Sequence, residues 1–339
     1  EENLGEGYVR LRVSEAERRQ AKHDIQHVED IVIEMLRNAR DAGADKVYLA
    51  TTKEDGVRTL VFLDNGSGVP QDMQERIFDA RVTSKLESLK MDRWGVHGRG
   101  MALFSIKQNT DEACVVASDV DLGSVFKVSV ATDRLGERAD QSSWPQAVKD
   151  EDGHYVCARG PHNIIRAACE FALEELRACD VYLGSPSEIA ATLHAQASSR
   201  LDASRLLFID DEAELPVVDR LGLASDAEDF IRICSGLGLE MSERTAHRIL
   251  AGQIKPVRGV TARLLRERDS SSHASAPVDL AKDRRGLRIA KDDMAQFSRA
   301  VERDFNDLAS RYYLNLCGDP KIRVSRDRIT VTFDLAKEE

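Results

Sequence analysis

The feature that most constrains the fold is an apolar stripe along residues 15–43. Apolar side chains recur there at spacings of three and four residues, which is the pattern of a helix that buries one face. They are Val28, Ile31, Val32, Met35, Leu36, Ala39 and Ala42. Gly43 follows as an expected C-terminal cap, because glycine readily adopts the left-handed backbone that ends many helices. We therefore predict a single long helix over residues 15–43.

Two strand-like runs follow this helix, at residues 46–52 and 58–64. The glycine-containing turn at 54–56 predicts that they pair as a hairpin. This order of helix and strands predicts an α/β domain in residues 1–135, in which a mixed sheet lies under helices. The remaining elements expected in this domain are a helix at 101–107 and strands at 113–118 and 124–131.

The rest of the chain is less regular. Residues 136–160 are polar, which favours a linker or a long excursion. Residues 161–339 predict a mainly helical α+β region, and residues 226–251 have the helix, glycine turn, helix pattern of a helix-turn-helix. Its other expected elements are helices at 163–177, 187–197 and 292–313, strands at 181–183 and 206–209, and a closing hairpin of 321–324 with 328–334.

The composition argues against several classes of protein. No apolar run approaches the roughly 20 residues that a membrane helix needs. The N-terminus lacks the apolar core of a signal peptide, so we expect a cytoplasmic protein. Six scattered cysteines without a Cys-x-x-Cys pair argue against a zinc site or a disulfide framework. A net charge of −11 argues against nucleic-acid binding over the whole surface, but a local basic patch stays open.

Three polar residues share one stripe of the predicted helix. Glu34, Asn38 and Asp41 lie at positions i, i+4 and i+7, so they face the same side. Every amphipathic helix has a solvated face, and this ordinary interpretation accounts for the stripe equally well when it is taken alone. The stripe becomes informative only in combination with two glycine-containing motifs later in the chain.

A glycine-containing loop follows the second predicted strand. Asp64 ends that strand, and Gly66 and Gly68 come directly after it. Glycines at such positions let the backbone approach a ligand closely. A carboxylate at the strand end can accept a hydrogen bond from an exocyclic amine such as that of adenine. The loop alone is a weak signal, because turns of this kind are common.

A second glycine run precedes the helix predicted at 101–107. Gly95, Gly98, Arg99 and Gly100 belong to a Gly-x-x-Gly-x-Gly pattern. Backbone N–H groups of such a run, together with the helix N-terminus, can face phosphate oxygens. This pattern is also weak alone, but the helix stripe, the loop and the run occur in order within the predicted α/β domain.

Together these motifs resemble those of the GHKL superfamily, the gyrase, heat-shock chaperone, histidine kinase and MutL ATPases. The resemblance implies a two-layer Bergerat-type sandwich that binds ATP. In the family's motif Glu34 would activate water, Asn38 would hold Mg²⁺, Asp64 would bind adenine and the glycine run would bind phosphates. Residues 69–97 would form a lid over the nucleotide.

Details of the motifs favour particular branches of that superfamily. The residues around Asn38, followed later by Thr83 and Lys85, resemble MutL-type ATPases, whereas the complete glycine run is closer to the topoisomerase VI B type. This interpretation adds Asp41, Thr83 and Lys85 to the nucleotide contacts, although an ordinary solvated lysine is the alternative for Lys85. The motifs of P-loop enzymes and protein kinases are absent from the sequence.

The function implied is a Mg²⁺-dependent ATPase that acts as a nucleotide-driven conformational switch, with DNA maintenance as the expected setting and a homodimer through the ATPase domain as the expected assembly. One alternative is a histidine or serine kinase of the same superfamily. Another is a nucleotide-sensing DNA-binding regulator with little turnover. His23 and His27 precede the motif, but they lie too close to Glu34 for a separate dimerisation hairpin, so structural or surface roles are favoured.

The segment from 244 to 268 concentrates basic side chains in an acidic protein. Clustered arginine commonly binds phosphate, so this segment is a candidate nucleic-acid contact. The residues expected to make it are Arg244, Arg248, Lys255, Arg258 and Arg263. The alternative is a solvated helical pair packed on the ATPase domain, since helix-turn-helix shapes without nucleic acid are common.

Overall fold

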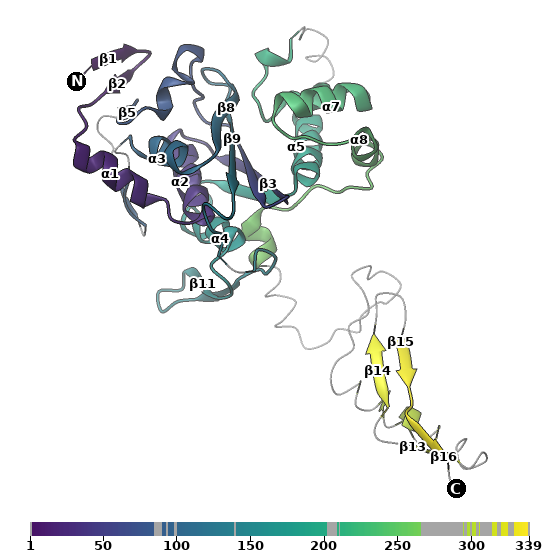
Figure 1. The fold of residues 1–339 in the computed structure, drawn as a ribbon. Helices are drawn as coiled ribbons and strands as arrows, with labels where there is room; N and C mark the ends of the chain where they lie inside the picture. The colour runs from purple at the N-terminus through teal and green to yellow at the C-terminus, as the bar shows by residue number, and fades with distance from the viewer. Residues whose placement is uncertain are drawn as a thin grey trace. The chain divides into compact units, whose positions relative to one another are not determined.

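The computed structural model divides the chain into two compact units, Glu1–Ser271 and Ser272–Glu339. Figure 1 shows the elements of each unit. The residues that the structure describes are 2–84, 90–92, 94–97, 100–138, 140–201, 209, 211–265, 294, 297–298, 300–302, 305, 314–316, 320–324, 329–337. None of the helices in this described part combines the length and the apolar character that a bilayer-spanning helix needs.

A five-stranded sheet with the order β12-β3-β4-β9-β8 forms the centre of the first unit. β12 runs parallel to β3, and the other neighbouring strands are antiparallel. The α/β class and the mixed sheet predicted from the sequence are therefore confirmed. The strands are β3 (Lys46–Glu54), β4 (Val57–Asp64), β8 (Glu112–Ser118), β9 (Ser124–Ala131) and β12 (Asp180–Gly184).

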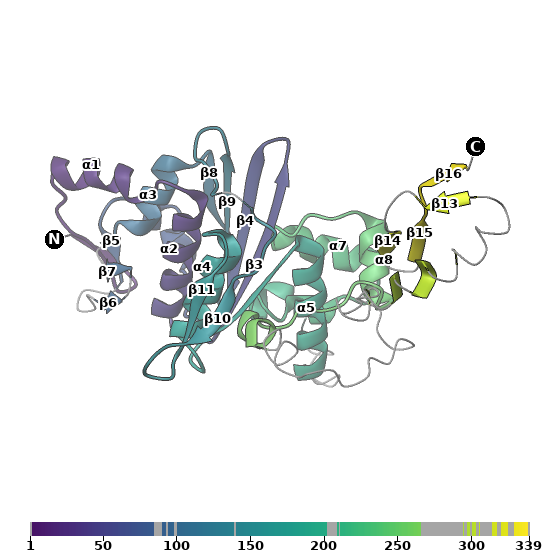
Figure 2. The same cartoon turned by 90° about the horizontal axis from the view of Figure 1, so that it is seen from below.

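One face of this sheet carries three helices, α2 (Val28–Asp41), α3 (Ala102–Asn109) and α4 (Ile164–Glu174). Figure 2 shows them together on one side of the strands. The apolar stripe of α2 is buried with Leu49 of β3 and Leu60 of β4 in one cluster. Because side chains alternate across a strand, the neighbours of these strand residues face the other way.

Helices from later in the chain cover the opposite face. Tyr48 and Val61 of the sheet form a second buried cluster with Ile189, Leu193 and Phe230 of these helices. The resemblance implied a two-layer sandwich, and the structure adds a third, helical layer to it (Figure 2). The helices of this layer are α5 (Pro186–Arg200), α7 (Ala227–Gly236) and α8 (Glu243–Leu250).

The single helix predicted over residues 15–43 is wrong, because the chain forms α1 (Glu15–Asp24) and α2 with a break between them. The Asp30 carboxylate accepts hydrogen bonds from the N–H groups of Gln26 and His27, both at 2.9 Å. These bonds satisfy donors that a new helix N-terminus leaves open. Extended backbone at Ile25 and His27 completes the break.

The segment predicted as a linker or a long excursion at 136–160 is part of the first unit. It forms an antiparallel hairpin of β10 (Gln146–Lys149) and β11 (Tyr155–Arg159). Leu135 and Trp144, on either side of the predicted boundary, both pack into the core cluster of α2. Because β12 also pairs with β3, the sheet needs residues well beyond 135, and the compact unit continues to Ser271.

Small elements complete the first unit. A second sheet has the order β1-β2-β5, and a hairpin of β6 with β7 lies between β5 and α3 in the chain. These elements are β1 (Glu2–Gly5), β2 (Tyr8–Arg10), β5 (Val82–Thr83), β6 (Lys90–Asp92) and β7 (Gly95–His97). Four short 3₁₀ helices are η1 (Gln71–Met73), η2 (Arg76–Phe78), η3 (Glu212–Glu214) and η4 (Arg220–Leu223).

The second unit contains two strand pairs. β14 (Lys321–Val324) and β15 (Ile329–Thr332) pair antiparallel, which confirms the predicted closing hairpin. β13 (Leu314–Leu316) pairs antiparallel with β16 (Leu335–Lys337). Most of the strand predicted at 206–209 and most of the helix predicted at 292–313 lie outside the described residues.

Candidate functional site

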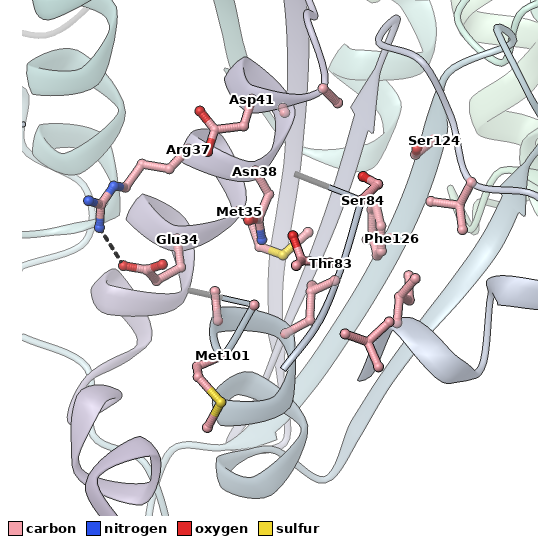
Figure 3. A pocket seen from close by; sticks show the side chains of 18 of the residues that line it. Glu34, Met35, Arg37, Asn38, Asp41, Thr83, Ser84, Met101, Ser124 and Phe126 are labelled. Carbon is pink, nitrogen blue, oxygen red and sulfur yellow. Dashed lines mark hydrogen bonds and ion pairs between the residues drawn. The ribbon is translucent and has the colours of Figure 1, made fainter. Parts of the chain in front are cut away.

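A cavity of about 600 Å³ lies beside α2 in the first unit. Side chains of α2 form one wall, and the ends of β4 and β9, the start of α3 and parts of α1 and β2 complete it. Figure 3 shows Glu34 and Met101 toward one end of this cavity and Ser124 and Phe126 toward the other. The cavity therefore has room and chemically different ends for a ligand of nucleotide size.

Most of the residues predicted for a nucleotide site line this single cavity. They are Glu34, Asn38, Asp41, Asp64, Gly68, Thr83 and Gly100. Gly66 and Gly95 are described but are not among the lining residues. Lys85, Gly98 and Arg99 lie outside the described residues, so the geometry of the glycine run is known only at Gly95 and Gly100.

The polar stripe of α2 faces the cavity because its apolar stripe packs on the sheet. Glu34, Asn38 and Asp41 all line the cavity, whereas Ile31 and Leu36 belong to the buried core and do not line it. The Asn38 side-chain nitrogen is buried and has no hydrogen-bond partner among the described residues. An amide in that state has unused hydrogen-bonding capacity, which favours contact with a ligand.

Asp64 is the last residue of β4 and is only 4% exposed. Its Oδ1 accepts a hydrogen bond from the Gly66 N–H at 2.8 Å. A Cβ on Gly66 would lie 2.9 Å from that oxygen and 2.8 Å from the carbonyl oxygen of Ala42. Gly66 therefore fits a different role from the predicted ligand contact, because it holds the Asp64 carboxylate and allows the loop to pass close to α2.

Gly68 is the position where the same loop passes closest to the turn between β8 and β9. Its φ is +70°, and a Cβ there would lie 1.8 Å from the carbonyl oxygen of Asp119. The Val69 N–H donates to Ser118 Oγ at 2.8 Å, and that hydroxyl donates to the Gly123 carbonyl at 2.8 Å. No pattern in the sequence points to Ser118 or Gly123, because strand pairing brings these residues into contact with the loop.

The apolar lining was also missed by the sequence analysis. Phe62, Val69, Ile77 and Phe126 all border the cavity and also belong to the core cluster. Aromatic and aliphatic side chains of this kind suit the faces of a flat heterocycle. No motif distinguishes these residues from ordinary core positions, so the sequence carried no signal for them.

The N-terminal residues add polar groups that no motif predicted. Tyr8, Gln20 and Asp24 line the cavity from β2 and α1. Burial raises the pKa of the Tyr8 phenol, and a hydrogen bond to Ser84 opposes that shift. The phenol therefore stays protonated at neutral pH and can donate a hydrogen bond.

The predicted lid, residues 69–97, is only partly separate from the core. Met73, Ile77, Phe78 and Val82 are buried in the core cluster of α2. Short 3₁₀ helices place Met73, Ile77 and Phe78 without a helical or strand period, so no pattern in the sequence predicts their burial.

The residues that line the cavity can be compared with the groups that ATP and Mg²⁺ need for binding. The cavity offers a buried carboxylate between apolar walls, and Asn38 and Asp41 supply oxygens of the hard type that Mg²⁺ prefers. Ala102 and Leu103 at the start of α3 also line the cavity, where a helix N-terminus favours phosphate. The donor set present therefore fits a magnesium nucleotide.

Comparison with known proteins agrees with this chemistry. Residues 25–121 match the model of a family described as histidine kinase-, DNA gyrase B-, and HSP90-like ATPase. The matched segment runs from just before α2 to the turn between β8 and β9, so it contains most of the cavity lining. No curated protein matches the chain.

The close approach at Gly68 generates a prediction about the stability of the fold. Gly56 is a matched control, because its φ is +79° but a Cβ there would meet nothing within 4 Å. We expect Gly56→Ala to cost about 1–2 kcal/mol from backbone conformation alone. Gly68→Ala should cost more, because the new methyl group must displace the Asp119 carbonyl.

Urea unfolding of both variants measures this difference. Equal destabilisation by the two substitutions would contradict the close contact between the loop and the β8–β9 turn.

Proposed function

We propose that the protein binds Mg²⁺ and ATP in the cavity beside α2 and hydrolyses the ATP. The match of residues 25–121 to the histidine kinase-, DNA gyrase B-, and HSP90-like ATPase family supports this proposal. The observation that carries the proposal is the convergence of buried Asp64 with Glu34 and Asn38 on one cavity. These residues come from two separate motifs, and an ordinary solvated helix face would not bring them together around one cavity.

The burial of Asp64 supports the proposal that the adenine binds at this end of the cavity. Its carboxylate is buried, and a buried carboxylate favours a strong hydrogen-bond donor. The exocyclic amine of adenine is such a donor, and Phe62 and Phe126 border the same cavity. Ser124, which pairs with Asp64 across the β4–β9 ladder, adds a hydroxyl at this end.

The α2 end of the cavity supports the chemistry of hydrolysis. Asn38 would hold Mg²⁺, which supplies charge neutralisation for the phosphates when it is bound. Glu34 lies one helical turn before Asn38, where its carboxylate can orient a water molecule and accept a proton from it. The N–H groups at the start of α3 and at Gly100 can stabilise negative charge on phosphate oxygens.

The first prediction that tests the proposed function concerns Asp64→Asn. The amide can present a donor to the exocyclic amine, so affinity for a non-hydrolysable ATP analogue should fall about 10-fold or more. Asp45→Asn is the matched control, because Asp45 accepts a hydrogen bond from Asn65 of the same loop but does not line the cavity. Calorimetric titration with Mg²⁺ measures both, and undiminished affinity of Asp64→Asn would contradict the adenine assignment.

The second prediction concerns Glu34→Ala. Loss of a general base should slow hydrolysis by about 10²–10⁴-fold, while binding of the ATP analogue stays intact. Steady-state phosphate release and calorimetry on the same preparation measure the two quantities. Equal turnover of the variant and the wild type would mean that Glu34 is structural. Transfer of label from ATP to the protein, in place of phosphate release, would favour the kinase alternative.

A nucleic-acid contact is a second candidate function, and the exposure of α8 favours it. Arg244 and Arg248 are both exposed on this helix, and Lys255 and Arg258 are exposed in the segment after it. Arg263 favours the alternative, because its guanidinium lies 3.8 Å above the Trp144 ring of the same unit. We therefore propose Arg244 and Arg248 of α8 as the centre of this contact.

The third prediction tests this contact by charge reversal. Arg244→Glu with Arg248→Glu should abolish retention of duplex DNA and leave ATP hydrolysis intact. Arg18→Glu with Arg19→Glu is the control, because it makes the same charge change on exposed residues of α1. Wild-type affinity should fall with salt at a log–log slope near −0.9 per phosphate contacted. Absence of DNA retention at low salt would contradict this candidate function.

A further inference from the structure

Arg37 is a buried charged residue that the proposed chemistry does not use. Its side chain is only 3% exposed, although it lies on α2 between Glu34 and Asn38. Burial of a guanidinium is costly unless several hydrogen bonds compensate for the lost water. The partners of Arg37 therefore indicate what this side chain does in the fold.

The guanidinium of Arg37 joins two carboxylates. Its Nη1 donates to Glu34 Oε1 at 2.7 Å, which is the contact drawn in Figure 3. Its Nε and Nη2 donate to Asp92 Oδ2 and Oδ1 at 2.9 and 3.0 Å. The second pairing is bidentate, so it fixes the plane of the guanidinium as well as its position.

Asp92 belongs to β6 and is itself buried, with a side chain 6% exposed. Arg40 adds a second cation, because its Nη1 lies 3.2 Å from Asp92 Oδ2 and 3.1 Å from Glu175 Oε1. A continuous chain of charged contacts therefore runs from Glu34 through Arg37 to Asp92. Its two ends lie on different elements, the helix that carries the proposed base and the β6–β7 hairpin.

The hairpin has further contacts with the helical layer. Asp92 Oδ1 also accepts from the Trp94 N–H at 3.1 Å, which shapes the turn between β6 and β7. The Trp94 ring stacks on Phe171 of α4 at a centroid distance of 6.4 Å. Trp94 lines the cavity as well, so a displacement of this hairpin would alter both the cavity and the partners of Arg37.

We propose that Arg37 is a positioning residue for Glu34, and that Asp92 holds Arg37 in place, so that docking of the β6–β7 hairpin on α2 sets the rate of hydrolysis. This inference rests on the proposed function, in which Glu34 acts on water. Arg37 donates to one oxygen of the Glu34 carboxylate, and this hydrogen bond keeps the carboxylate turned toward the cavity. When the bidentate contact from Asp92 is lost, the plane of the Arg37 guanidinium is less constrained, and the direction of the Glu34 carboxylate is therefore less constrained as well.

The test uses Asp92→Asn, which keeps the shape of the side chain but removes its charge. We expect kcat for ATP to fall by about 10-fold to 10²-fold, since small misplacement of a reacting group has effects of this size. KM and affinity for a non-hydrolysable analogue should change by less than about two-fold, because Asp92 is not a lining residue. Arg37→Lys, which keeps the charge but not the fork, should lower kcat in the same range; because Arg37 itself lines the cavity, its KM is not used in this comparison.

The matched control is Glu137→Gln. Glu137 accepts from Arg58 in a pair that is also buried, but this pair lies away from the cavity lining. Each of these carboxylates pairs with two cations, Asp92 with Arg37 and Arg40 and Glu137 with Arg58 and Lys53, so Glu137→Gln should lower stability without lowering kcat. If Asp92→Asn and Glu137→Gln change kcat equally at matched stability, the role of Asp92 is only structural and the inference is wrong.

A double-mutant comparison separates this inference from the proposed function. In a Glu34→Gln background, Asp92→Asn should cause no further loss of kcat, because its effect passes through Glu34. If the effects of Glu34→Gln and Asp92→Asn on kcat are fully additive, the inference is wrong. If Glu34→Gln is slow and Asp92→Asn matches wild type, only the inference fails. If Glu34→Gln turns over like wild type, the proposed function fails first.

Hydrogen exchange provides a readout that does not depend on turnover. In the protein without nucleotide, Arg37→Lys should increase exchange at residues 90–92 and 94–97, because the hairpin loses its bidentate contact with α2. Exchange in β3 and β4 should stay unchanged. Wild-type protection of the hairpin in this variant would overturn the inference, whatever the activity of the enzyme.

Discussion

The contact between the C-terminal end of α2 and the loop after β4 determines the geometry of the site. The Ser67 N–H donates to the Ala42 carbonyl at 2.9 Å, and Gly66 passes so close to Ala42 that no side chain fits there. This contact fixes the helix that carries Glu34 and Asn38 relative to the strand that ends at Asp64. Without it, the two groups would have no defined separation across the cavity.

Packing on both faces of the sheet keeps that contact in place. β3 and β4 alternate between the core of α2 and the core of α5 and α7, so a shift of either strand would disturb two apolar clusters. The loop after β4 is also tied to the β8–β9 turn through Ser118. The proposed nucleotide site therefore lies at the edge of a three-layer unit. The β6–β7 hairpin is joined to this site through the ion pairs of Asp92 and the stacking of Trp94.

The sequence was sufficient to predict the elements that have a clear period or a glycine signal. The α2 stripe, the β3–β4 hairpin, β8, β9 and the turn after Asp64 all follow from local patterns, and the convergence of Glu34 and Asp64 on one cavity agrees with the motif order. The break before α2 was missed because residues 15–24 are polar and permit a helix on their own. The third layer was missed because nothing local shows which face a later helix will cover.

The remaining part of the site depends on contacts between distant residues. Arg37 and Asp92 lie far apart in the sequence, and neither stands out until the hairpin is placed against α2. Buried charges of this kind are constrained by three-dimensional pairing, so no period or spacing predicts them. Met73 and Ile77 are a similar case, because short 3₁₀ helices bury them without a regular pattern.

The most direct test of the account is a crystal structure of the protein with Mg²⁺ and a non-hydrolysable ATP analogue. The account predicts that the adenine amine donates to the Asp64 carboxylate, that Asn38 holds the metal, and that Glu34 faces the terminal phosphate. A nucleotide bound in the reverse direction, or bound outside the cavity beside α2, would contradict it.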